Sequence, residues 1–200
     1  DASMNFTGTA GETKTITVLV NGDNKVELDE TFTVALGAIS GAPAGVTTAG
    51  SPQTGTITND DAAVISIAAN QSGPESSSPQ TFNVTISNPI DVDITLNFAT
   101  SDGTATTADN DYTSLNATLL FVATSQSLPV PVAIINDNKV EANEVYNVTL
   151  SGISASGRNV TFGTNTATGT IVNDDAAVVT LSGGIAKNEG NAGTTSYVFT

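Results

Sequence analysis

The sequence contains no cysteine, no histidine and no tryptophan, and only five of its 200 residues are basic. Without cysteine there is no disulfide framework, thiol nucleophile or zinc–thiolate site. Without histidine the chain cannot form a Ser-His-Asp triad or an imidazole-ligated metal centre. The formal net charge of −15 argues against a nucleic-acid partner, because phosphate binding needs Lys and Arg on one face. Aromatic residues for a sugar cleft are scarce too, so we expect a binding or structural protein and not an enzyme.

Long apolar runs are also missing. No run approaches the roughly 18 apolar residues that a membrane helix needs, so we expect this segment not to span a membrane. The chain starts at Asp1 without a signal peptide and stops in a strand-like run at 197–200, so we expect both ends to be cuts through something longer. The abundance of Thr, Ser, Asn and Gly suits a secreted bacterial surface protein. We therefore expect an extracellular or cell-surface location.

An internal repeat organises the chain. The block TGTITNDDAAV at 54–64 recurs with one change as TGTIVNDDAAV at 168–178, a shift of 114 residues (175 − 61). The block DNKVE at 23–27 recurs at 137–141 with the same shift. Such a period is the size of a domain and well above the range of about 20–50 residues of solenoid repeats. We predict the C-terminal part of one domain at 1–61, a complete domain at 62–175 and the N-terminal strands of a third at 176–200.

Within the complete domain, apolar and polar residues alternate as they do in strands, for example at Phe82, Val84 and Ile86. Pro129 and Pro131 indicate that one strand lies partly at an edge or bulge. Short strands with turn-rich spacers predict an all-β fold of tandem immunoglobulin-like, seven-stranded β-sandwich domains. The predicted strands of the complete domain lie near 64–69, 80–88, 93–99, 116–121, 128–135, 144–151 and 165–173.

The acidic residues gather at one end of this predicted sandwich. If each strand reverses the direction of the previous one, alternate loops share an end, and nine of the eleven acids between 64 and 175 fall at the same end. Two like charges about 4 Å apart repel by roughly 1 kcal/mol in water and by several-fold more near a protein surface. Calcium removes that cost with about six to eight oxygen ligands in flexible geometry, whereas magnesium prefers a strict octahedron. No EF-hand spacing is present, so the predicted calcium site is assembled from several loops.

The same residues also fit a plainer interpretation. Asn-Asp-Asp and Ser-Asp-Gly are ordinary turn sequences, and acids just before a strand can be solvated charges. We interpret Asp91 and Asp93, at the opposite end, in that way. The concentration of the other acids at one end, and their partial repetition 114 residues apart (137 − 23), favour a metal site.

Several of these stretches resemble the Calx-beta family, the immunoglobulin-like calcium modules of sodium–calcium exchangers and of many large bacterial surface proteins. The resemblance covers nearly the whole chain. It is carried by SDGTAT at 101–106, DNDY at 109–112, IIND at 134–137 with Glu141 and Glu144, and GTIVNDD at 169–175.

The resemblance implies calcium ligands in the complete domain at Glu75, Asp111, Asp137, Glu141, Glu144, Asp174 and Asp175, with a backbone carbonyl near Lys139. Asp109, from the same acid-rich loop as Asp111, is a further candidate. We call the units 1–61, 62–175 and 176–200 the first, second and third copies of the repeat. The corresponding candidates are Asp23, Glu27, Glu30, Asp60 and Asp61 in the first copy and Glu189 in the third. Asn136 stands where the family commonly has Asp, and the first copy has Gly22 there, which implies a site with fewer ions.

Three functions fit this sequence. Asp60 and Asp61 run directly into the first strand of the next domain without a Gly/Ser linker, so Ca²⁺ bound at the domain junction would stiffen an extracellular array with a role in adhesion or matrix. Alternatively, the chain is a filament subunit in which residues 176–200 complete a neighbour's sandwich by strand addition. A third hypothesis is an adhesin whose loop 152–164 recognises a surface ligand. The expected partners are calcium ions, neighbouring domains of the same chain or identical subunits, and an unknown surface ligand.

Overall fold

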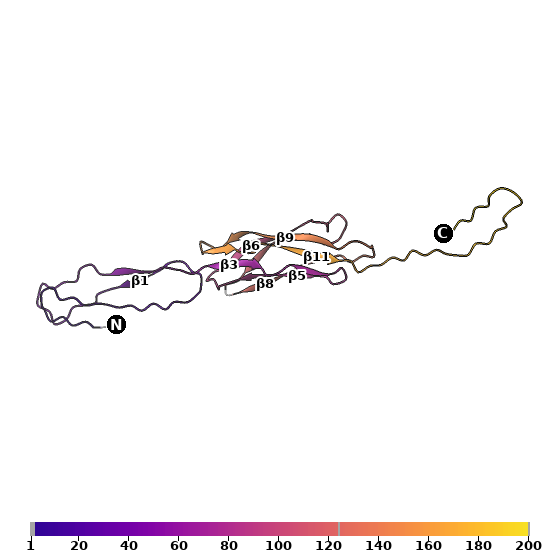
Figure 1. The fold of residues 1–200 in the computed structure, drawn as a ribbon. Coiled ribbons are helices and arrows are strands. Elements are labelled where there is room, and N and C mark those ends of the chain that lie inside the picture. The colour runs from indigo at the N-terminus through magenta and orange to yellow at the C-terminus, as the bar shows by residue number, and fades with distance from the viewer. Residues whose placement is uncertain (1–2, 124, 200) are drawn as a thin grey trace.

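The structure, a computed structural model, describes residues 3–123 and 125–199. Figure 1 shows a β-sandwich in the middle of the molecule, with the N-terminal segment at one end and the residues after β11 leaving from the other. The N-terminal segment contains one antiparallel pair, β1 (Glu30–Val34) and β2 (Gln53–Ile57). The sandwich strands are β3 (Ala63–Ile67), β4 (Gln71–Pro74), β5 (Gln80–Ile86), β6 (Ile94–Ser101), β7 (Asn116–Phe121), β8 (Ser127–Val132), β9 (Glu144–Ser154), β10 (Val160–Phe162) and β11 (Thr166–Val172).

The sandwich consists of a four-stranded sheet in the order β10-β3-β5-β8 and a five-stranded sheet in the order β4-β11-β9-β6-β7. This arrangement confirms the predicted all-β sandwich. The described part of the chain holds no helix that is long and apolar enough to cross a membrane. The domain boundaries predicted from the repeat, 1–61, 62–175 and 176–200, remain a prediction.

The first and last strands of the sandwich differ from the sequence prediction because each is divided between the two sheets. The chain passes from β3 in one sheet to β4 in the other, and β10 and β11 are divided in the same way. The two halves of the first strand pair in parallel with the two halves of the last, β3 with β10 and β4 with β11. Alternation of apolar residues does not report which sheet a strand belongs to, so the sequence predicted seven continuous strands where the structure has nine segments.

The core lies between the sheets and is built from the alternating residues that the sequence indicated. The ring of Phe82 in β5 packs edge-on against the ring of Tyr146 in β9, and Val84 and Val148 of the same strands belong to the same core; all four are fully buried. Burying one such side chain stabilises the fold by about 1.5–3 kcal/mol. Pro129 and Pro131 are exposed on β8, the edge strand of its sheet, as predicted, because an edge strand has no partner for the missing N–H.

Tyr146 fixes the position of β11, the strand that leads into the acidic end. Its ring covers Gly169, its cross-strand partner, and a Cβ at residue 169 would overlap the ring. Its hydroxyl donates a 2.9 Å hydrogen bond to Gln80 Oε1, and Gln80 Nε2 donates one of 2.8 Å to the backbone oxygen of Thr170. Phe32 covers Gly55 in the same way in the first copy. The register of β11, and therefore the position of residues 173–175, is set by this buried contact.

Candidate metal centre

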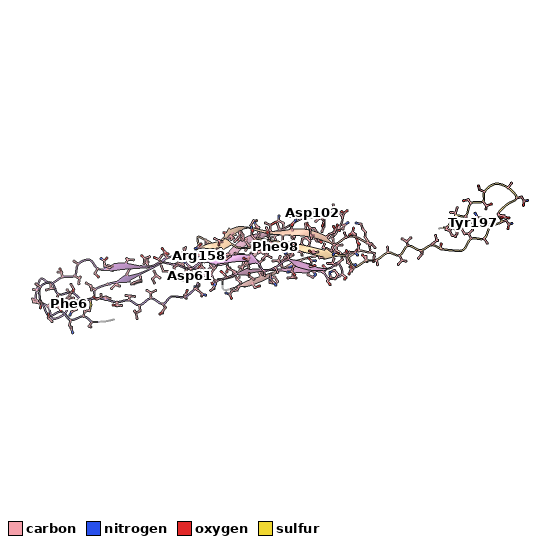
Figure 2. All side chains as sticks on the ribbon, in the orientation of Figure 1. Phe6, Asp61, Phe98, Asp102, Arg158 and Tyr197 are labelled. Carbon is pink, nitrogen blue, oxygen red and sulfur yellow. The ribbon has the colours of Figure 1, made fainter. Side chains whose placement is uncertain are left out.

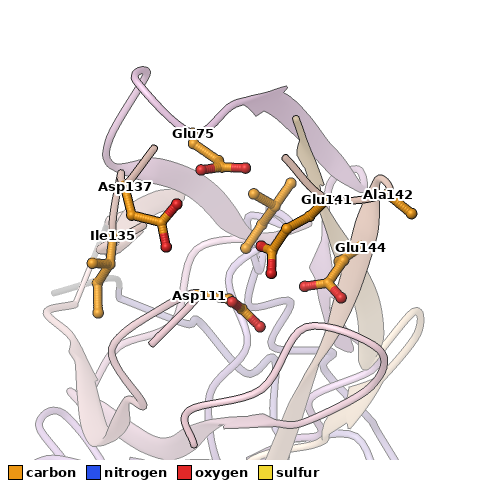
Figure 3. Close-up of a pocket in the computed structure, with 8 residues that line it drawn as sticks. Glu75, Asp111, Ile135, Asp137, Glu141, Ala142 and Glu144 are labelled. Carbon is orange, nitrogen blue, oxygen red and sulfur yellow. The ribbon is translucent and has the colours of Figure 1, made fainter. Parts of the chain in front are cut away.

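One end of the sandwich collects carboxylates from five separate segments, four of which line a common pocket. Figure 3 shows them around a common pocket: the segment after β4, the loop after β6, the long connection between β8 and β9, and the start of β9. The exit of β11 adds a further one. Assignment of loops to ends by strand direction predicted this gathering. The pocket is lined by Glu75, Asp111, Ile135, Asp137, Glu141, Ala142, Glu144 and Ile171.

The carboxylates form two groups of three. Glu75, Asp137 and Asp175 each offer an oxygen within 4.8 Å of the other two, and Asp111, Glu141 and Glu144 do the same. Glu75 is only 5% exposed and Asp111 only 8%. Buried carboxylates at this spacing repel one another through a medium less polar than water, so the folded chain holds them together at an energetic cost.

Asp111 is held in place by the loop on which it lies. Its Oδ2 accepts a 2.6 Å hydrogen bond from the backbone N–H of Thr106, and its backbone oxygen accepts one of 3.0 Å from Ile135 N–H. The next residue, Tyr112, forms an isolated antiparallel bridge with Ile134. These contacts tie the loop after β6 to the end of the β8 segment, so two loops that carry candidate ligands are joined directly.

Asp102 orders the same loop without belonging to either group. Its Oδ1 accepts a 2.7 Å hydrogen bond from the Tyr112 hydroxyl and one of 3.1 Å from the Thr107 N–H. Burial, with the adjacent Asp102 carboxylate, raises the pKa of Tyr112 to about 12, so the hydroxyl stays protonated and donates. Asp102 is one of the nine acids that strand direction assigned to this end, and the sequence indicated no role for it as a ligand. The Ser-Asp-Gly sequence could have indicated an ordered turn around Asp102. Glycine is needed at residue 103 because a Cβ there would overlap the backbone oxygen of Val145.

The connection between β8 and β9 is anchored to the exit of β11 through Asn173. Its Oδ1 accepts a 2.9 Å hydrogen bond from Glu141 N–H, and its Nδ2 donates one of 2.9 Å to the backbone oxygen of Asp175. The backbone N–H of Lys139 donates a 2.7 Å hydrogen bond to Asp137 Oδ1. The loop that carries Asp137 and Glu141 is therefore joined through Asn173 to the segment that carries Asp175.

The protonation of the two groups reflects their crowding. Burial, reinforced by the neighbouring carboxyls of Asp111 and Glu141, raises the pKa of Glu144 to about 7. Burial also raises the pKa of Glu75, and the charges of Asp137, Asp175 and Asp174 act in the same direction. Near neutral pH the site thus binds a proton that it would release to a cation, since a positive ion favours the charged form of each carboxyl.

The donor set fits a hard divalent cation. Asp175 Oδ2 is buried and has no hydrogen-bond partner among the described residues, which is costly for a charged oxygen. The other candidate atoms in both groups are carboxylate oxygens. Oxygen-only ligands from flexible loops are those that Ca²⁺ accepts, while nitrogen and sulfur ligands of transition-metal sites are missing.

Three predicted residues of this domain lie beside the groups and not in them. Asp174 accepts a hydrogen bond from the Ser76 hydroxyl. Asp109 is exposed and bonded to Thr106, from whose hydroxyl it accepts a 3.2 Å hydrogen bond. Lys139 forms an ion pair with Glu141, so its ammonium group occupies space beside the candidate site.

The acids of the other copies are less gathered. Among the described residues, no group of three carboxylates within 4.8 Å is found outside the second copy. The first copy nevertheless repeats the local geometry: Lys25 N–H donates to Asp23, and Glu27 N–H donates to Asn59, at 2.9 and 3.1 Å. Glu30 starts β1, Asp60 is exposed, the backbone oxygen of Asp61 accepts from Asn59, and Glu189 lies exposed in the C-terminal segment.

Comparison with known proteins agrees with this fold and these sequence motifs. The family model described as the Calx-beta domain matches residues 2–63 and 58–175, so the chain belongs to the Calx-beta family. A comparison with curated proteins found no match.

Solved structures of Calx domains share the sandwich. The Calx CBD1 domain in its apo form is 21% identical over 57% of this chain and 100% of that one, with a TM-score of 0.52. CBD12 from CALX1.2 is 21% identical over 56% of this chain and 44% of that one, with a TM-score of 0.51. The Calx CBD2 domain is 13% identical over 56% of this chain and 86% of that one, also at 0.51.

Proposed function

We propose that this chain is a calcium-binding segment of an extracellular or cell-surface array, in which Ca²⁺ bound at the acidic end of a repeat stiffens the junction with the next. The observation that carries the proposal is the buried Oδ2 of Asp175, which has no hydrogen-bond partner within the described residues and lies beside the carboxylates of Glu75 and Asp137. Membership of the Calx-beta family, whose resemblance to calcium modules the sequence motifs already indicated, supports the same ion. A binding role of this kind requires no catalytic residue.

The two groups of carboxylates define where the ion would bind. Glu75, Asp137 and Asp175 would hold one ion, and Asp111, Glu141 and Glu144 would hold a second or share the first. Because Asp175 follows β11 and precedes the segment that leaves the sandwich, its coordination would fix the direction in which the chain continues. Restricting that direction is what would turn a string of domains into a stiff rod.

Calcium titration of chelator-treated protein tests the proposal. We expect saturable heat on adding Ca²⁺ and a rise in melting temperature, because a ligand at one hundred times its dissociation constant stabilises the folded state by about 2.7 kcal/mol. Mg²⁺ at the same concentration should produce a smaller rise. Small-angle scattering should show a narrower range of lengths with Ca²⁺ than with chelator. The proposal would be ruled out if millimolar Ca²⁺ produced no heat of binding and changed neither the melting temperature nor the range of molecular lengths.

A filament subunit is the second candidate, and one observation favours it. Val178 and Val179 are 84% and 100% exposed, whereas Val64 and Ile65, the residues 114 positions earlier (178 − 64), lie in the sandwich strand β3, where Ile65 is fully buried. An exposed segment with the sequence of a core strand can add to a neighbouring sheet. Light scattering across a concentration series separates the candidates: a monomer at all concentrations excludes strand exchange between chains.

A further inference from the structure

The first copy is anchored to the sandwich by an apolar residue, Val26, which belongs to neither group of candidate metal ligands. Val26, in the loop of the first copy that precedes β1, is fully buried and belongs to the hydrophobic core of the following sandwich. It forms a parallel bridge with Ile90, in the loop between β5 and β6. Its backbone N–H donates a 2.9 Å hydrogen bond to Pro89 O, and its backbone oxygen accepts one of 3.3 Å from Asp91 N–H. Side chain and backbone together join two copies of the repeat.

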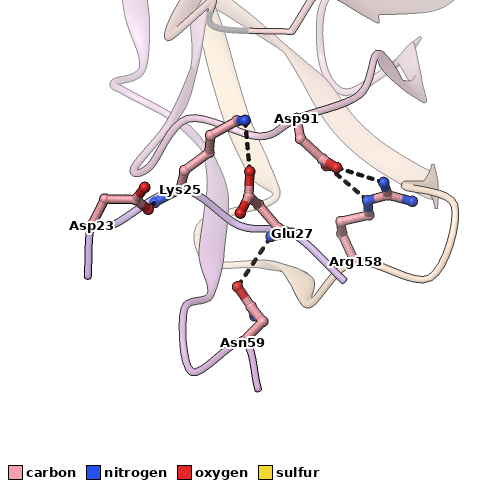
Figure 4. Close-up of polar contacts among 6 residues, drawn as sticks. All are labelled: Asp23, Lys25, Glu27, Asn59, Asp91 and Arg158. Carbon is pink, nitrogen blue, oxygen red and sulfur yellow. Dashed lines mark hydrogen bonds and ion pairs between the residues drawn. The ribbon is translucent and has the colours of Figure 1, made fainter. Parts of the chain in front are cut away.

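The surface that receives Val26 is shaped and charged to hold this loop. Leu28 lies beside Gly157, where an added Cβ would be 3.8 Å from Leu28 Cδ2. Next to it, Arg158 donates two hydrogen bonds to the carboxylate of Asp91, at 2.8 and 2.6 Å (Figure 4). The side chains of Arg158 and Asp91 are only 12% and 22% exposed, so this pair is more than a solvated surface contact. The sequence interpretation of Asp91 as a solvated charge missed this ion pair.

The end of the sandwich that receives Val26 is not the end that carries the acidic groups. Figure 2 labels Asp61 and Arg158 at one end of the sandwich and Asp102 toward the other. Val26 therefore docks from a preceding copy, whereas the candidate calcium groups face the segment that follows.

The second copy contains the same loop with its valine free. Val140, 114 residues after Val26 (140 − 26), is 52% exposed. The hydrogen bonds that shape the loop are nevertheless present in both copies, from Lys139 N–H to Asp137 and from Glu141 N–H to Asn173 in the second. The loop holds its shape without docking, and a preorganised loop loses little conformational entropy when it binds.

We propose that Val26 is an apolar plug that fixes the orientation of one repeat on the next without any metal ion. The matching surface consists of residues 89–91 and 157–158 of the following repeat. Val140 is then a second plug, and its partner is the corresponding surface of another repeat of this kind. This contact, which we call the latch, goes beyond calcium stiffening because it is expected to persist when a chelator removes Ca²⁺. It also assigns a role to the end of the sandwich at which the described residues form no candidate calcium group.

Backbone amide exchange of the full chain, followed by NMR in chelator, tests the latch. The Asp91 amide reports on docking because its hydrogen bond crosses the junction to Val26 O. The amides of Ile67 and Leu150 report on the sandwich itself, through bonds to Thr164 O and Asn165 O. Val26→Asp should lower the protection of the Asp91 amide by about ten- to a hundredfold, the ratio that corresponds to exposing one buried valine, and leave the other two unchanged.

Val140→Asp is the matched control, since it makes the same chemical change at the same loop position where the side chain is already exposed. It should leave the Asp91 amide as protected as in the unchanged chain. Val26→Ala is a milder variant, in which protection of the Ile67 and Leu150 amides reports that the sandwich is folded, and it should lower the protection of the Asp91 amide by a smaller factor. An Asp91 amide that is unprotected in the unchanged chain in chelator, or equally protected in all three variants, would overturn the latch. That outcome would leave the calcium titration unaffected.

Discussion

Asn173 Oδ1 accepts a 2.9 Å hydrogen bond from the backbone N–H of Glu141, and 114 residues earlier (173 − 59) Asn59 accepts the equivalent bond from Glu27 at 3.1 Å. Each asparagine also donates to the backbone oxygen of the aspartate two residues later. The repeated block NDD therefore has a structural reason for its first residue: asparagine joins the exit of the last strand to the loop that carries the acids.

Asn173→Ala should weaken calcium binding by about tenfold or more. Residues that do not touch the metal but hold its ligands in position by hydrogen bonds typically contribute that much to affinity. The substitution removes no carboxylate, and among the described residues it breaks the side-chain hydrogen bonds of Asn173 to Glu141 N–H and to the backbone oxygen of Asp175. Calorimetric titration measures the change. Asn59→Ala is the control, since it breaks the same bonds in the copy whose acids are not gathered. Equal affinities of the two variants would show that the asparagine does not position the site.

Asp175→Asn should have opposite effects on the free and the calcium-bound protein. Without Ca²⁺ it removes one charge from the group with Glu75 and Asp137, so the melting temperature should stay the same or rise. With Ca²⁺ the affinity should fall roughly tenfold or more, because affinity depends on the number of charged ligands. Thermal unfolding with and without Ca²⁺ measures both effects.

Asp109→Asn is the control for that experiment. It removes the same charge from the same end of the sandwich, but at an exposed residue that lies in neither group. We expect a much smaller change in affinity. If both variants lost the same affinity, the ion would be held by the general charge of this end and not by the two groups.

The difference between Asp109 and Asp111 also marks how far sequence reasoning reaches. Strand direction alone assigned both residues to the acidic end, because alternate loops of a sandwich must share an end. Which of them meets the other carboxylates depends on Asn110, whose φ of 66° turns the chain between them. Asparagine adopts this left-handed conformation more readily than most residues, but the sequence does not reveal at which asparagine it occurs.

The sequence also did not reveal that the first and last strands are divided between two sheets. A first strand was predicted near 64–69, and in β3 Ala63, Ile65 and Ile67 are the buried residues, yet the crossing to β4 depends on pairing with β10 and β11 far along the chain. Val26 was hidden as well, since its neighbours in sequence are polar and its burial is supplied by another copy.

The stability of the ion-free protein should fall as pH rises from about 4.5 to about 7. The pKa of Glu144 is about 7 in the folded chain against an ordinary value of 4.5, so the folded state holds a proton that the unfolded state releases. The stabilising contribution is complete below pH 4.5 and is lost as the pH passes 7. Ca²⁺ should reverse the loss above pH 7, and its affinity should decline below pH 7 because the proton competes for Glu144.

Thermal unfolding between about pH 4.5 and pH 7 measures the effect. Glu144→Gln should flatten the plot of stability against pH for the ion-free protein. An unchanged slope of that plot in the variant would assign the pH dependence to another group.

Gly169→Ala should destabilise the sandwich by about 1–3 kcal/mol, the usual cost of forcing an extra carbon into a packed core. The new Cβ would overlap the ring of Tyr146, which cannot move away because its hydroxyl is bonded to buried Gln80. Displacing the ring would also disturb β11 and the exit that carries Asp175, so calcium affinity should decrease together with stability. Gly184→Ala makes the same change where an added Cβ has nothing within 4 Å, and it should leave both quantities unchanged. Urea unfolding and calcium titration of the two variants measure this, and equal stability of both would mean that the Tyr146–Gly169 contact does not set the register of β11.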